Sequence, residues 1–439
     1  MISLPVVLAV FNLALAVTRL YFCVKAARLM AIVWFLITYF MVFFIPVSVA
    51  SPFTHERKFH GERIPIDQTD FLFALAYVAA FNLIFLVTEL MCSHLFRVKG
   101  IGNSIDENLK RRFMPAVIAA MTTMWLVSSV LYFYGTIGFT YHNYVESVVS
   151  WPIVFFWASA PLASILALRK NYLVAAVVCL PYLYFASVLN VRSFALLTVI
   201  PVLVIFLAQQ SLGVKSLSVK LTRMVWSMSI AGGLALMISV VALTGKNAGA
   251  NTQILPDSGM PFGTVIMLKL VEKYHISTGF DALELYSKNL INPFMRLFGV
   301  KPSATLDPPA VMAQLFEGYD KGDVSNYFHY PTLWYTDAYI AFGLAGLFMP
   351  ILWGFVLAAW EKCITLNPGW LALFFPAWCW HAYMLVRGAT SGAAMPFNYA
   401  VYFSFIVMIL SGGIKLFAMQ KLSVSTPKKA NLGWGNSQP

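Results

Sequence analysis

Apolar runs of helix length recur along almost the whole chain, separated mostly by short polar stretches. A run of about 20 apolar residues is long enough to cross a hydrocarbon core about 30 Å thick. Because lipid offers the backbone no hydrogen-bond partners, such spans are expected to be helices. We predict eleven of them, at residues 3–24, 30–50, 71–96, 113–135, 151–168, 172–189, 194–209, 224–245, 335–360, 369–386 and 397–418.

Composition agrees with this pattern. The chain is 60% hydrophobic and 11% charged, whereas soluble domains carry about 25% charged residues. This excludes an ordinary soluble domain and predicts an all-α polytopic integral membrane protein.

Positive charges gather in alternate connections between the predicted spans. One set of connections, together with the C-terminal tail, holds 16 cations against the acids Asp106, Glu107 and Glu361. Those cations are Lys25, Arg28, Arg97, Lys99, Lys110, Arg111, Arg112, Arg169, Lys170, Lys215, Lys220, Arg223, Lys362, Lys421, Lys428 and Lys429. The positive-inside rule places this set in the cytoplasm, so the N-terminus is expected outside and the C-terminus inside. The net charge of +12 then follows from topology, and binding of nucleic acid is not implied.

One external connection is much longer than the others. Residues 246–334 separate the eighth and ninth spans, and long loops in compact proteins are usually functional. Within them, 263–275 and 280–299 place apolar residues at helical spacing with charges on the other face, which predicts helices lying on or dipping into the membrane. The loop is interpreted either as a lid or as a substrate-binding cap.

These features divide the chain into four parts. They are an N-terminal bundle (1–245), the long periplasmic loop (246–334), C-terminal spans (335–418) and a cytoplasmic tail (419–439).

Several cations stand on the external side, against the orientation rule. Arg192 lies in the short turn NVRS, and Arg387 begins the small-residue stretch RGATSGAAMP. Arg296 and Lys301 lie in the long loop. Guanidinium forks suit phosphate or diphosphate groups, because two N–H donors match two anionic oxygens. The alternatives are interfacial anchoring or pairing with a nearby acid.

The end of the long loop, SNYFHYPTLWYTDAYIAFGLAGLF (325–348), carries the remaining candidates. His329 is a candidate acid or base near neutral pH. Asp337 is either a base or the counter-ion of Arg192 or Arg387.

Aromatic residues flank these two, among them Phe328, Tyr330, Trp334, Tyr335 and Tyr339. They fit an interfacial aromatic belt and would equally suit stacking on sugar rings. Elsewhere, Glu89 and His381 are expected to form helix–helix hydrogen bonds. Ligand spacing typical of zinc is absent, and we expect neither a metal nor a cofactor.

Three stretches resemble a known family. The segment HYPTLWYTDAYIAFGLAGLF resembles the histidine-containing loop end and F-G-x-x-G span of Wzy-type O-antigen and oligosaccharide repeat-unit polymerases and the related O-antigen ligases. VLNVRSFALL is similar to their arginine after a short periplasmic turn. LVRGATSGA is similar to their arginine–glycine loop before the last span.

The resemblance implies a GT-C-like glycosyltransferase of the bacterial inner membrane. Members lengthen a polysaccharide from undecaprenyl-diphosphate-linked oligosaccharides, without a metal or nucleotide sugar. It implies as partners membrane lipid, a flippase and a chain-length regulator. Arg192, Arg387 and Arg296 would stabilise the diphosphate leaving group, with Lys301 beside them. His329 would position or deprotonate the acceptor hydroxyl, and Tyr330, Trp334 and Tyr335 would contact substrate.

Two alternatives stay open. An O-antigen ligase transfers the finished glycan to lipid A-core with similar residues. A transporter or flippase of a lipid-linked sugar or anion would show broken helices and charges within its spans.

Overall fold

The computed structural model describes residues 3–49, 58–59, 62–63, 66–98, 114–136, 159–188, 198–203, 205–206, 259–275, 277–281, 283–284, 286–288, 290, 332–366, 368–387 and 392–394. Within them the fold is helical apart from one small hairpin, in which β1 (Lys58–Phe59) pairs antiparallel with β2 (Glu62–Arg63). The helices are α1 (Leu4–Lys25), α2 (Ala31–Val49), α3 (Gln68–Leu95), α5 (Met114–Thr136), α8 (Pro161–Leu168), α9 (Tyr172–Val188), α12 (Gly259–Tyr274), α15 (Trp334–Phe342), α16 (Met349–Leu366) and α17 (Pro368–Val386). Two 3₁₀ helices, η3 (Gly343–Phe348) and η4 (Gly392–Ala394), complete the described elements.

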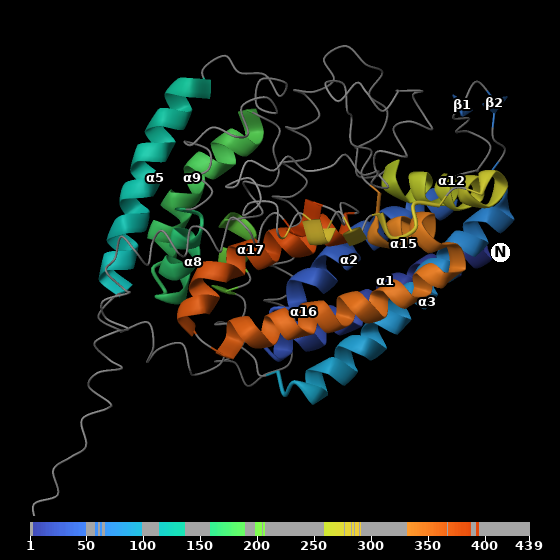
Figure 1. The fold of residues 1–439 in the computed structure, drawn as a ribbon, viewed down its shortest axis with the longest axis horizontal. Helices are drawn as coiled ribbons and strands as arrows, with labels where there is room; N and C mark the ends of the chain where they lie inside the picture. The colour runs from blue at the N-terminus through green and yellow to red at the C-terminus, as the bar shows by residue number, and fades with distance from the viewer. Residues whose placement is uncertain are drawn as a thin grey trace, which may run out of the picture.

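The helices pack in two groups joined by one helix. In the first group α1 packs on α2 and α3, and α3 packs on α16. In the second, α8 packs on α5 and α9. Helix α17 contacts α2 and α16 on one side and α8 on the other, so it connects the groups (Figure 1).

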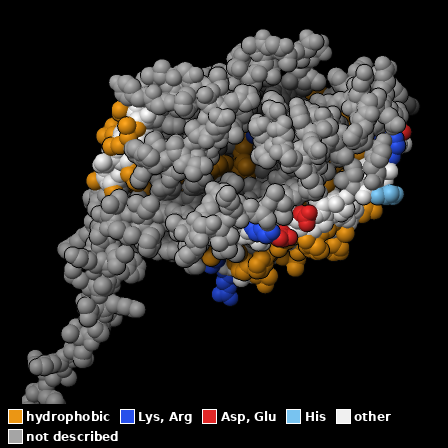
Figure 2. Space-filling view, turned by 45° about the horizontal axis from the view of Figure 1, so that its top comes forward, with side chains coloured by type: hydrophobic (Ala, Val, Ile, Leu, Met, Phe, Trp, Pro, Cys, Tyr) orange, Lys and Arg blue, Asp and Glu red, His pale blue; other side chains and the backbone are white. Residues whose placement is uncertain are grey.

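Four helical segments among the described residues are long and apolar enough to cross a membrane. They are Leu4–Lys25, Ala31–Val49, Gln68–Leu95 and Trp334–Thr365. Large apolar side chains on α1, α3 and α16 are exposed, among them Phe11, Leu83 and Phe355, and Figure 2 shows such side chains along one edge of the molecule. Exposed apolar surface of this kind is expected to face lipid. For the described residues, the prediction of an α-helical membrane protein is thus confirmed.

The finer topology stays a prediction. Helices α5, α9 and α17 match the predicted spans 113–135, 172–189 and 369–386, and α8 occupies the end of 151–168. Residues 198–203, 205 and 206 are helical within 194–209. The predicted spans 224–245 and 397–418 lie outside the described residues.

The predicted span at 335–360 is not one straight helix. Along α3, Trp334 contacts Phe85 at 4.9 Å between ring centroids, whereas Tyr339 contacts Phe73 at 5.9 Å. Residues later in α15 therefore lie beside residues earlier in α3, so the two helices are antiparallel. Helix α16 runs the other way, because Gly346, just before it, lies beside Tyr77, whereas Phe355 contacts Phe96 just beyond the end of α3. Elements α15, η3 and α16 form a helical hairpin.

For orientation, we call the end of this group at which α3 begins the Asp67 end and the opposite end the Phe96 end. The sequence predicts that the Asp67 end is external. Helix α15 begins midway along α3 and runs toward the Asp67 end, so it is a half-helix buried in the bundle.

The chain reverses at Gly343. This residue has φ +59° and ψ −136°, a conformation that side chains with a Cβ rarely adopt. Breaking the helix frees the last carbonyls of α15. Long-loop residues satisfy them: the Thr278 and Gly279 amides donate to the Ile340 and Ala341 carbonyls at 3.3 and 3.1 Å.

Helix α12 covers the same hairpin. The expected helix over 263–275 is present, and begins earlier, at Gly259. Its apolar side chains are buried against α2, α3 and α15. Lys269 forms an ion pair of 2.5 Å with Asp70 in the first turn of α3, and Thr264 shares a 2.8 Å hydroxyl contact with Thr336 of α15. The long loop therefore packs into the bundle at the Asp67 end.

We expect Gly343→Ala to lower the free energy of unfolding by about 1–3 kcal/mol, because a Cβ makes the reversal strained. Gly263→Ala is the matched control, since the added Cβ meets nothing within 4 Å inside α12. It should raise stability by about 0.5–1 kcal/mol. Titration of both variants with a denaturing detergent measures the difference between their free energies of unfolding. If the two substitutions changed the free energy of unfolding equally, the helix would continue through residue 343.

Candidate functional site

Asp337 lies inside the bundle, in the first turn of α15. Its side chain is only 3% exposed, and the Thr332 hydroxyl donates a hydrogen bond to its carboxylate. A negative charge near a helix N-terminus is favoured by the helix dipole. The sequence placed Asp337 where a span enters the membrane from outside. The structure instead places it on a half-helix that starts midway along α3, because the chain reverses at Gly343.

Trp334 and Tyr335 belong to a buried aromatic cluster. Trp334 contacts Phe81 and Phe85 at 5.2 and 4.9 Å. Tyr335 contacts Phe44 and Phe81 at 6.2 and 6.1 Å. Both are at most 2% exposed. The aromatic-belt interpretation is wrong for these two, because a belt residue faces the lipid interface.

Tyr339 is another aromatic of α15 that is buried rather than in a belt. It is 3% exposed and packs on Tyr77 at 5.0 Å between ring centroids. The roles of Trp334 and Tyr335 in substrate binding stay predictions.

Arg387 directly follows α17 and is partly exposed. Its Nη1 donates to the Tyr383 hydroxyl at 2.6 Å, and its Cζ lies 5.4 Å from the centroid of that ring. Because α17 starts just after α16 ends and runs back beside it, Arg387 lies toward the Asp67 end. The tyrosine hydroxyl thus helps to orient the guanidinium.

His381 is fully buried one and a half turns before Arg387. Its Nδ1 lies 2.6 Å from the carbonyl oxygen of Ala393 in η4. The sequence suggested a hydrogen bond between helices, and this partner lies in the 3₁₀ helix that follows α17 in the chain. A backbone carbonyl carries no sequence signal, so the contact could not be found from residue types.

The other candidate residues lie outside the described residues. They are His329, Tyr330, Arg192, Arg296 and Lys301. Their convergence with Arg387 and Asp337 stays a prediction. Within the described part of the chain, no group of three or more His, Cys, Asp and Glu side chains could hold a metal ion.

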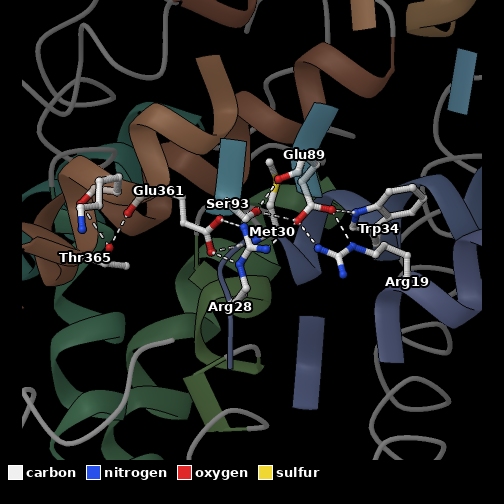
Figure 3. A network of polar contacts seen from close by, with 9 residues as sticks. Arg19, Arg28, Met30, Trp34, Glu89, Ser93, Glu361 and Thr365 are labelled. Carbon is white, nitrogen blue, oxygen red and sulfur yellow. Dashed lines mark hydrogen bonds and ion pairs between the residues drawn. The ribbon is translucent and has the colours of Figure 1, made fainter. Parts of the chain in front are cut away.

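A second polar cluster, which we call the tetrad, consists of Arg19, Arg28, Glu89 and Glu361 (Figure 3). Arg28, between α1 and α2, donates at 2.6 Å to each glutamate. Arg19 Nε donates to Glu89 at 2.6 Å. Both glutamate side chains are 0% exposed, and the arginines are 12% and 8% exposed.

Further donors complete the tetrad. The Trp34 indole N–H donates to Glu89 at 3.1 Å, and the Met30 amide contacts Glu361 at 3.4 Å. The expected role of Glu89 in helix–helix hydrogen bonding is confirmed. The predicted cytoplasmic connections contained Arg28 and Glu361, and the structure buries both. Two cations and two anions balance, so the tetrad offers no excess charge to a ligand; it fixes α1, α2, α3 and α16 at the Phe96 end.

We expect Glu361→Gln to lower stability by about 3–5 kcal/mol, because it leaves a buried positive charge uncompensated. The double variant Arg28→Gln/Glu361→Gln should recover part of that loss, since the neutral Arg19–Glu89 pair remains. Thermal unfolding in detergent measures both.

The control for this experiment is an exposed pair. Glu284→Gln breaks the ion pair between Glu284 and Lys288, whose side chains are 53% and 35% exposed, respectively. This substitution should lower the free energy of unfolding by at most about 0.5 kcal/mol. If the double variant is no more stable than Glu361→Gln, charge balance is not what the tetrad supplies.

No protein-family model, no curated protein and no solved structure matches this chain.

Proposed function

We propose that this protein polymerises undecaprenyl-diphosphate-linked oligosaccharide repeat units at the external face of a bacterial inner membrane. One observation carries the proposal furthest. The segment that resembles the polymerases folds, from Thr332 on, into a buried half-helix, and two long-loop segments pack directly on it. A long loop assembled with the histidine-to-glycine segment is the arrangement that a glycan-binding cap requires.

The reaction needs cations where the lipid diphosphate leaves. The bond between the anomeric carbon of the growing glycan and the diphosphate oxygen breaks, and the electron pair stays on the diphosphate. Arg387, held by Tyr383, together with Arg192, Arg296 and Lys301, would stabilise that charge. An acceptor hydroxyl of the new repeat unit forms the new bond to the anomeric carbon, and its proton passes to His329.

Asp337 fits a supporting role in this scheme. It is buried, and it accepts a hydrogen bond from Thr332, three residues after His329. Its carboxylate therefore holds Thr332, the first described residue after His329. Pairing with Arg192 or Arg387, which the sequence suggested, stays a prediction.

A transporter of lipid-linked sugars or anions is the second candidate. The half-helix α15 and the tetrad are features that transporters place within the membrane. Against this, α15 carries its own carboxylate at its N-terminal turn, and the tetrad is neutral. Neither presents an unbalanced charge to a moving substrate, so polymerisation is preferred.

We expect Arg192→Ala and Arg387→Ala to abolish polymer formation while the protein remains in the membrane. Arg387→Lys should keep partial activity, because an ammonium retains the charge but loses the two-pronged fork. Purified protein with lipid-linked repeat units provides the assay. Arg169→Ala, which removes an exposed arginine from the set expected to be cytoplasmic, is the control.

Three outcomes separate the candidates. Full-length polymer from both alanine variants would refute the diphosphate clamp. Lipopolysaccharide with a bare core in a deletion strain would identify a ligase, since a polymerase deletion leaves one repeat on the core. Movement of lipid-linked units across proteoliposomes without their lengthening would identify a transporter.

A further inference from the structure

Helix α16 brings a cation to the end of α3. Phe355 of α16 contacts Phe96 at 5.4 Å between ring centroids. Lys362 lies seven residues after Phe355 and so on the same face of α16, and its Nζ donates to the carbonyl oxygen of Arg97 at 3.4 Å. Arg97 and Lys362 therefore lie side by side at the Phe96 end of the bundle.

Helix α1 brings a third cation to the same level. Asn82 of α3 donates to Asn12 of α1 at 3.5 Å, and seven residues later in both helices Arg19 donates to Glu89 at 2.6 Å. The two helices therefore run parallel and in register. Six residues further on, Lys25 ends α1 at the level where α3 ends.

These three cations are not balanced by acids of the described part of the chain. The glutamates of the tetrad are paired with the tetrad's own arginines. No ion pair between described residues includes Lys25, Arg97 or Lys362. The side chains of Lys25 and Arg97 are exposed, and that of Lys362 is partly exposed. The ammonium of Lys362 has three N–H donors, so the contact with the Arg97 carbonyl leaves it able to bind an anion.

The surface beside Arg97 and Lys362 is apolar. On α3, Met91 and Leu95 are 61% and 73% exposed, and on α16 Phe355 is 52% exposed. Exposed apolar faces of α3 and α16 therefore end at Arg97 and Lys362, and Figure 2 shows basic side chains at one end of the exposed apolar surface. In a membrane protein such faces contact lipid tails, and cations at their end lie among the headgroups.

A ligand that fits this place needs an anionic head and apolar chains. The phosphate of a phospholipid can accept from both cations at once, and its acyl chains can cover the apolar faces. A free phosphate would leave those faces uncovered. An acidic segment of a soluble protein would not reach side chains that lie in lipid. The sequence predicts that the Phe96 end is cytoplasmic, and the cytoplasmic leaflet is the one rich in anionic lipid.

We propose that the ends of α3 and α16 bind one anionic phospholipid of that leaflet. Its phosphate lies between Arg97 and Lys362, and its acyl chains run along the exposed apolar faces of the two helices. Lys25 adds to the attraction from α1. The lipid bridges two of the helices that the tetrad joins, and so it stabilises the same end of the bundle from outside. This site lies at the opposite end from Arg387 and is independent of the proposed reaction.

The test measures lipid binding by the whole protein in dodecyl maltoside. The protein is titrated with dioleoylphosphatidylglycerol or with dioleoylphosphatidylcholine, which has the same chains and no net charge, and native mass spectrometry counts the bound lipids. We expect tighter binding of the glycerol lipid. In Arg97→Gln/Lys362→Gln its affinity should fall about 30-fold, because each cation near an anionic lipid contributes about fivefold. The exchanged variant Arg97→Lys/Lys362→Arg should bind as wild type does.

A matched control removes the same charge elsewhere. Arg169→Gln/Lys170→Gln changes two exposed residues that follow α8 in the second helix group, and it should leave the affinity unchanged. Equal affinity of wild type for the two lipids overturns the proposal, and so do equal losses in the two neutralised double variants.

Thermal unfolding gives a second readout that separates the sources of the anion. We expect phosphatidylglycerol to raise the Tm of wild type by about 3 °C and that of Arg97→Gln/Lys362→Gln by much less. Without added lipid the two proteins should unfold at the same temperature, because the substituted side chains are not buried. An equal rise in Tm with inorganic phosphate, or with polyglutamate, overturns a lipid site in favour of a free anion or an acidic protein.

Discussion

Burial of opposite charges constrains the first helix group more than any other interaction does. Glu89 of α3 accepts from Arg19 of α1 and from Arg28, and Arg28 also reaches Glu361 of α16. In a low-dielectric interior these charges cannot separate without a large desolvation cost. Sliding of any one helix would leave a buried charge without its partner. The tetrad therefore sets the register of four elements at once, which apolar contacts alone do not do in lipid.

That register is transmitted to the half-helix through aromatic rings. The Trp34 N–H is bound by Glu89, its ring lies 5.6 Å from Phe85, and Phe85 lies 4.9 Å from Trp334. The start of α15 is thus positioned two ring contacts away from the tetrad. This contact therefore also sets the positions of Asp337, one turn later, and of Thr332, which precedes the helix. A structural constraint at one end of the bundle thereby sets the geometry of the candidate site in its interior.

The helices were largely predictable from the sequence, because runs of apolar residues of sufficient length have few other solutions in lipid. The direction of α15 was not. Residues 335–360 read as one predicted span, and nothing in the sequence distinguishes Gly343 from Gly346 or Gly354 within it. The reversal depends on carbonyls capped by Thr278 and Gly279, which lie far away in sequence.

The candidate site was also only partly predictable from the sequence. Asp337, Arg387 and Glu89 stand out as charges beside apolar residues, but their partners follow only from packing. Arg19, which pairs with Glu89, was not singled out from the sequence. Thr332 and Tyr383 carry no charge, and His381 binds a backbone carbonyl. These contacts therefore leave no recognisable pattern in the sequence.

The capping of α15 has a consequence for how this chain can diversify. Ser277, Thr278 and Gly279 bind the C-terminal end of the half-helix, and Thr332 immediately precedes its N-terminal end. A nine-residue helix is about 13 Å long, so the intervening stretch leaves and returns at points a short distance apart. Each doubling of a loop with fixed ends costs only about 0.6 kcal/mol of closure entropy. Changes in chain length between Gly279 and Thr332 that spare Arg296, Lys301 and His329 therefore cost little closure entropy while both ends of α15 stay tied.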